Sequence, residues 1–194
     1  MLINDGDTVC IVGAGPGGSA CAIALLSEAR RVGRKINVVL FEHKKFSEHR
    51  HYNQCIGVLS PPFEDILKNE LDLTLPENLV LNNMEGYRLH SDLLSLDLIG
   101  EESGRSVSVR RSKFDAFMLE EAQKAGAQVV HNRVTSIEIN HDGVLVYSEG
   151  DCGNRCDCLK NPITKQILVS IFSKYSIFLS LYQVLCILLY IVNY

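Results

Sequence analysis

Apolar residues occur in short blocks along the first part of the chain, and their period changes from one block to the next. Residues 8–12 form a short apolar run that is typical of a buried strand. Residues 16–31 carry a broad apolar surface with helical spacing, as expected for a helix packed on a sheet. Residues 36–41 form a second apolar run, and such runs belong to parallel strands covered on both faces. The pattern predicts a strand–helix–strand unit.

The middle of the chain predicts a mixture of helix and strand. Residues 63–71 favour a short helix. Apolar and polar side chains alternate over residues 94–98 and 106–109, which predicts strands with one buried face. A longer helix follows, because residues 112–115 have the pattern of a capping box and Gly126 is suited to end a helix.

The last third of the chain predicts three further features. Residues 128–131 favour a short strand, and residues 134–140 and 144–148 alternate on either side of a turn, which predicts a hairpin. A polar, cysteine-dense connector follows over residues 151–162. Residues 175–194 contain no charged side chain.

These segments divide the chain into three expected parts. Residues 1–150 are predicted to form an α/β domain, a Rossmann-like βαβ unit with an added β-rich segment. Residues 151–162 are the connector, and residues 163–194 are expected to form an apolar helical tail.

A glycine-rich turn joins the first predicted strand to the first predicted helix. It reads Gly13-Ala14-Gly15-Pro16-Gly17-Gly18, and an acid ends the next strand, which is the context that makes this motif specific for dinucleotides. Gly13 permits the tight turn, and Gly15 lets the backbone approach a pyrophosphate. Gly18 allows close packing of helix on strand.

The start of the helix and the acid complete the expected site. Pro16 and Gly17 lie in the first turn, where backbone N–H groups and the helix dipole favour phosphate and where the missing N–H of proline is harmless. Glu42 can accept hydrogen bonds from ribose hydroxyls and would repel a 2′-phosphate. We therefore expect the adenosine half of FAD or NAD here, rather than NADP.

Composition and charge narrow the function classes. The 194 residues carry a net charge of −4, which gives no electrostatic footprint for nucleic acid. The seven cysteines are an odd number, and Cys10 and Cys21 lie in the nucleotide-binding unit, which favours a reducing compartment over a disulfide framework. The N-terminus lacks the basic region of a signal peptide, so a cytoplasmic location is expected. No His or Cys pattern with ligand spacing predicts a metal site.

Four segments between about residues 7 and 149 carry a resemblance to a known family: residues 12–20, 39–42, 54–61 and 109–115. Together they resemble the geranylgeranyl reductase-like branch of FAD-dependent oxidoreductases, relatives of the aromatic-ring hydroxylases. The resemblance implies FAD as cofactor and NAD(P)H as electron donor. It also implies a small-molecule or lipid-like substrate.

The resemblance assigns roles to individual residues. The glycine-rich turn would hold the FAD pyrophosphate, and Glu42 the adenosine ribose. Arg110 would reach the cofactor, and the backbone of Val134 would meet the adenine. The loop with Cys55 and Gly57 would approach the isoalloxazine or the substrate. Cys55 itself is either a catalytic or redox thiol or a small buried apolar residue.

The chain departs from this family after the predicted hairpin. Another strand, a second glycine-bearing flavin motif and most of the substrate domain would follow there, and none is recognised after Glu149. We therefore expect an incomplete chain whose tail is an aberrant continuation. The alternative is a membrane anchor with contact through residues 175–194, although a helix over residues 176–192 would span only ~25 Å of an apolar layer about 30 Å thick.

The expected function is the FAD-binding portion of a flavin-dependent oxidoreductase. One alternative is an NAD-dependent dehydrogenase, which would continue with a regular βαβ pattern after Glu42. The polar loop and proline pair within residues 43–62 argue against it. The other alternative is a catalytically inert nucleotide-binding or membrane-tethered fragment.

Overall fold

The computed structural model contains two compact units. Met1–Glu48 and Asp115–Tyr194 form the first unit, and His49–Phe114 forms the second. The residues that the structure describes are 3–46, 55–99, 106–140, 143–149 and 166–170.

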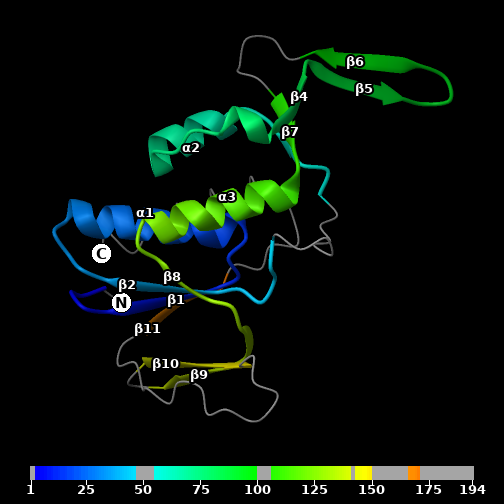
Figure 1. Ribbon diagram of the computed structural model, residues 1–194. Coiled ribbons are helices and arrows are strands. Elements are labelled where there is room, and N and C mark those ends of the chain that lie inside the picture. Colours follow the sequence, from blue (N-terminus) through cyan, green and yellow to red (C-terminus); the bar gives the residue numbers. More distant parts are fainter. Residues whose placement is uncertain (1–2, 47–54, 100–105, 141–142, 150–165, 171–194) are drawn as a thin grey trace. The chain divides into compact units, whose positions relative to one another are not determined.

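A four-stranded parallel sheet forms the centre of the first unit, with the strand order β11-β1-β2-β8 (Figure 1). When these four strands are numbered 1 to 4 by their order along the chain, the sheet reads 3-2-1-4 from the β8 edge. This is the strand order of doubly wound dinucleotide-binding folds. The order reverses between β1 and β11, and ligands of such sheets bind where this reversal occurs. The strands are β1 (Thr8–Val12), β2 (Asn37–Phe41), β8 (Gln128–Val130) and β11 (Gln166–Ser170).

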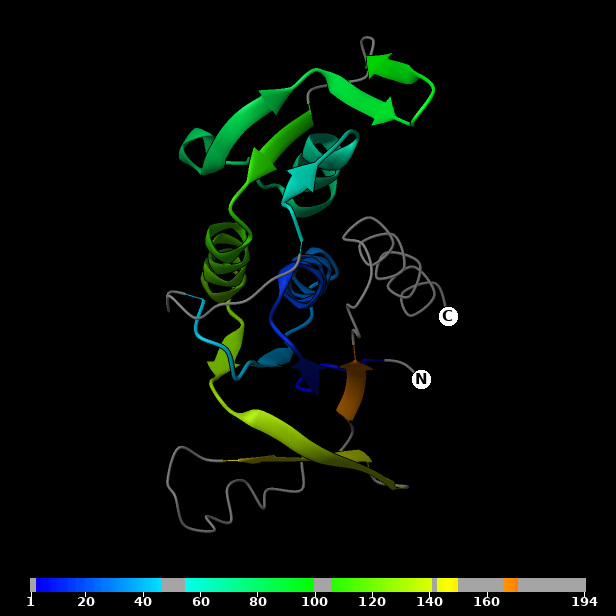
Figure 2. The same cartoon turned by 90° about the vertical axis from the view of Figure 1, so that its right-hand side faces the viewer.

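Helices cover one face of this sheet and a hairpin lies on the other. Figure 2 shows α1 (Pro16–Arg31) and α3 (Arg111–Lys124) on one side of the strands, with β9 (Arg133–Asn140) and β10 (Gly143–Glu149) opposite. Three consecutive residues of β1, Val9 to Ile11, are therefore at most 2% exposed. Covering on both faces explains the continuous apolar run, and the predicted strand–helix–strand unit and hairpin are confirmed.

Strand β11 corrects the expectation of a helical tail. Residues Gln166–Ser170 pair in parallel with β1, in register from Thr8 opposite Gln166 to Val12 opposite Ser170. Pairing occupies the backbone groups along one edge of β1, which a lone helix would leave open. The connector over residues 151–162 and the rest of the tail lie outside the described residues. In the described part of the chain, no helix has the length and apolar character needed to cross a membrane.

Helix α3 begins earlier than predicted. The carbonyl of Arg110 accepts hydrogen bonds from the N–H groups of Lys113 and Phe114, at 3.0 Å each. Arg110 is therefore the N-terminal cap, and Ser112 already lies in the first turn. The predicted capping box with Ser112 as cap was wrong, although the helix and its end at Gly126, with φ +108°, are confirmed.

The second unit is a small antiparallel sheet with a helix. Its order is β3-β7-β4, and α2 over residues 63–71 is confirmed as predicted. The rings of Phe63 and Phe114 meet edge to face at 5.6 Å, and Leu67 is fully buried. The elements are β3 (Val58–Leu59), α2 (Phe63–Leu71), a short 3-10 helix (Glu77–Leu79), β4 (Val80–Met84) and β7 (Ser106–Val109).

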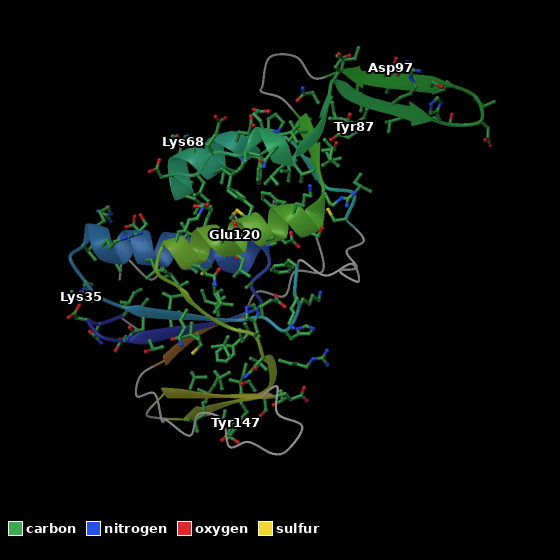
Figure 3. All side chains as sticks on the ribbon, in the orientation of Figure 1. Lys35, Lys68, Tyr87, Asp97, Glu120 and Tyr147 are labelled. Carbon is green, nitrogen blue, oxygen red and sulfur yellow. The ribbon has the colours of Figure 1, made fainter. Side chains whose placement is uncertain are left out.

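A two-stranded ribbon, β5 (Gly86–His90) with β6 (Ser95–Ile99), extends this unit. Its register places two polar pairs, Arg88 with Asp97 and His90 with Ser95, on one face. The Arg88 guanidinium binds the Asp97 carboxylate and holds the pKa of Asp97 below its usual value. Figure 3 shows Tyr87 and Asp97 on opposite sides of the ribbon. The predicted burial of one face was wrong for β6, since Leu96 and Leu98 on the apolar face are 51% and 48% exposed.

Candidate functional site

The glycine-rich turn follows β1, and its three glycines play three different structural roles. Gly13 has φ +96°, which side chains disfavour, and its N–H donates to the Phe41 carbonyl at 2.8 Å. Gly15 caps α1 with an extended backbone, and a Cβ added there would have no atom within 4 Å. A Cβ on Gly18 would lie 1.9 Å from the Gly13 carbonyl oxygen. Gly18 therefore has the packing role that the spacing predicted.

Glu42 lies beside this turn, at the end of β2, and is only 7% exposed. Its Oε2 accepts the N–H of Ala14 at 3.0 Å, and its Oε1 accepts the N–H of Lys44 at 2.8 Å. Its own N–H donates to the Val130 carbonyl at 3.0 Å, which ties the end of β2 to β8. The structure thus brings together the acid and the turn that the sequence predicted to act together.

This arrangement fits the adenosine and pyrophosphate parts of a dinucleotide. Each carboxylate oxygen can accept two hydrogen bonds, so Glu42 retains acceptor capacity for ribose hydroxyls after binding Ala14 and Lys44. The open space at Gly15 is next to the first turn of α1, where Pro16 is at the first position. Backbone N–H groups of a first helical turn bind phosphate without a cationic side chain.

Ser19 was not recognised in the sequence as part of this site. Its hydroxyl donates to the Ala14 carbonyl at 3.0 Å, and the side chain is fully buried. A serine in the first turn of a helix that follows a glycine-rich turn is the only signal that the sequence offers.

Three other candidate residues lie in the second unit. The Val109 N–H donates to the Gly57 carbonyl at 2.8 Å, so the loop of Cys55 and Gly57 is joined to β7, directly before Arg110. Gly57 has φ +76°, and a Cβ there would lie 2.0 Å from the Val109 carbonyl oxygen. The Cys55 Sγ accepts the Gly57 N–H at 3.4 Å. Cys55 is exposed, which removes the interpretation as a buried apolar residue.

Val134 lies in neither the turn nor the Cys55 loop. It is in β9, opposite Ser148 of β10, in a two-stranded sheet separate from the parallel sheet. Its side chain is half-buried. Within the described residues, no three His, Cys, Asp or Glu side chains are grouped so as to hold a metal ion.

The three described cysteines should differ sharply in reactivity. Burial raises the pKa of Cys10 to about 11 and that of Cys21 to about 12, so both remain protonated thiols at pH 8. Iodoacetamide at pH 8 should therefore label Cys55 in the native protein and should label Cys10 and Cys21 only after denaturation. Peptide mass spectrometry measures each site separately, and rapid native labelling of Cys21 would contradict the burial of α1.

Comparison with known proteins gives a consistent set of relatives. No family model matches the chain. The protein FixC of Escherichia coli K12 is 30% identical over 151 residues, covering 73% of this chain and 32% of FixC. YgcN of the same organism, a probable electron transfer flavoprotein-quinone oxidoreductase, is 30% identical over 134 residues, which are 66% of this chain and 28% of YgcN.

Solved structures show the same fold. A geranylgeranyl bacteriochlorophyll reductase-like protein from Thermoplasma acidophilum matches 84% of this chain and 39% of its own, with a TM-score of 0.57 and 21% identity. A variant of the halogenase PltM in complex with FAD matches 90% of this chain and 36% of its own, with a TM-score of 0.60 and 18% identity.

These matches cover only part of each relative. The chain spans about a third of the length of the FixC proteins that it matches. The relatives do not favour the alternative of an NAD-dependent dehydrogenase, and the PltM variant is itself bound to FAD. Sequence and fold together place the chain in the FAD-dependent oxidoreductase superfamily.

Proposed function

We propose that this chain forms the FAD-binding portion of a flavin-dependent oxidoreductase that acts on an apolar, lipid-like small molecule with NAD(P)H as the electron donor. The observation that carries the proposal is the hydrogen bond between Glu42 and Ala14, at 3.0 Å. It supports the proposal because the Glu42 carboxylate lies beside a turn whose Gly15 leaves open space at a helix N-terminus.

Each part of the site has a separate task in this proposal. The first turn of α1 binds the pyrophosphate, and Glu42 orients the adenosine by accepting its ribose hydroxyls. Arg110 binds the cofactor through its guanidinium, and the Val134 backbone contacts the adenine. The Cys55 and Gly57 loop faces the reacting ring or the substrate. When bound, the flavin ring supplies the redox chemistry, while the protein supplies orientation and excludes water.

The proposal extends to partners. The apolar residues 175–194 would make contact with a membrane from which a lipid-like substrate is taken, and the net charge of −4 argues against nucleic acid. The relatives named above include a quinone oxidoreductase, which is compatible with an apolar substrate.

Flavin binding is the direct test. The purified chain should show flavin absorbance bands after FAD is added and the excess is removed, and bound FAD should shift the melting temperature upward. Absence of both signals would refute the proposal. Turnover of NADH or NADPH with an artificial acceptor then separates an active oxidoreductase from an inert nucleotide-binding fragment, which binds FAD without turnover.

A further inference from the structure

Two buried side chains from different elements hold the residue at the centre of the glycine-rich turn. Glu42 accepts the Ala14 N–H at 3.0 Å, and the Ser19 hydroxyl donates to the Ala14 carbonyl at 3.0 Å. These two groups belong to the two peptide units on either side of the Ala14 Cα. Glu42 is 7% exposed, and Ser19 and Ala14 are fully buried.

The position of Ala14 means that its two hydrogen bonds restrict the conformation of the whole turn. It connects Gly13, with its left-handed backbone, to Gly15, which caps α1. With both neighbouring peptide units held, rotation about the Ala14 backbone is restricted, and the open side of Gly15 keeps one orientation. Water cannot replace these bonds easily, because both lie among buried atoms.

We propose that Glu42 and Ser19 are positioning residues that hold the phosphate-binding turn in its binding conformation before any cofactor arrives. The inference rests on the proposed dinucleotide site, and it gives Glu42 a second task besides accepting ribose hydroxyls. A turn formed in advance loses less conformational freedom on binding, so affinity depends on both residues.

Hydrogen exchange of the Ala14 amide in the FAD-free protein tests the turn alone. The parent amide should be protected, and Glu42→Gln and Glu42→Ala should each speed its exchange about tenfold or more, as loss of a hydrogen bond to a carboxylate predicts. Glutamine has one acceptor oxygen, so it cannot satisfy both Ala14 and Lys44. Glu28→Gln on α1 is the matched control, since it removes the same charge from a partly exposed pair with Arg31. An unprotected Ala14 amide in the parent overturns the inference, whether or not any variant folds.

Binding of two ligands separates positioning from ribose contact. ADP and 2′,3′-dideoxy-ADP differ only in the ribose hydroxyls, and calorimetry measures both. If Glu42 also holds the turn, Glu42→Gln lowers the affinity for dideoxy-ADP severalfold. Ser19→Ala then lowers the affinity for both ligands by the same factor. If Glu42 serves the ribose alone, the variant and the parent bind dideoxy-ADP alike, which overturns the inference. A parent that binds no FAD or ADP instead refutes the proposed function and leaves the exchange result to decide the inference.

Discussion

Gly15→Val should abolish FAD binding while leaving the fold intact. A Cβ at Gly15 meets no protein atom within 4 Å, and the extended backbone there suits a branched side chain. The added methyl groups would fill the space that the pyrophosphate needs, and each hydrogen bond lost to a charged group is worth roughly 1.5–3 kcal/mol. Two lost bonds weaken binding about a hundredfold or more.

Fluorescence titration with FAD measures this loss, and far-ultraviolet circular dichroism checks the fold. Gly15→Ala supplies an intermediate step, because a single methyl group enters the same space. If Gly15→Val binds FAD as tightly as the parent, the glycine-rich turn is only a structural turn and the cofactor assignment is wrong.

Gly18→Ala should damage the fold instead. The new Cβ would lie 1.9 Å from the carbonyl oxygen and 3.0 Å from the carbonyl carbon of Gly13. Both atoms belong to the backbone, so α1 or the turn must shift, and overpacking of this kind typically costs 1–3 kcal/mol and occasionally more. We expect a loss of about 3 kcal/mol and a melting temperature lower by on the order of 10 °C.

Urea unfolding followed by circular dichroism measures this change without any ligand. Gly15→Ala is the matched control, because it makes the same substitution three residues earlier, where there is room. A Gly18→Ala variant as stable as the parent would show that α1 does not pack on the turn as closely as the structure describes.

The first 42 residues could be interpreted closely from sequence because their signals are local. An apolar run, three glycines at fixed spacing and an acid at the end of a strand each restrict the conformation of a segment only a few residues long. The hydrogen bond from Ala14 to Glu42 joins residues 28 positions apart, so only the packed sheet shows which backbone group the acid meets. The bond from Ser19 to Ala14 joins residues only five positions apart, but a serine at the start of a helix does not by itself show which carbonyl its hydroxyl meets.

Two other features, the strand over residues 166–170 and the exposure of the apolar face of β6, could not be predicted from sequence patterns, for different reasons. Residues 166–170 lie in a long apolar stretch in which neither the spacing of apolar residues nor the composition distinguishes a strand from a helix. They form a strand because they pair with the edge of β1. Alternation over residues 94–98 predicted a strand with an apolar face correctly, but alternation carries no information about what covers that face.

The pairing of β1 with β11 also sets an order of assembly. Residue 8 is joined to residue 166, whereas β1, β2 and β8 are complete once residue 130 has been made. Contacts so distant in sequence form slowly, and during synthesis the N-terminal strands leave the ribosome first. The strand that precedes the glycine-rich turn therefore gains its second neighbour last, after β2 and β8 have been made.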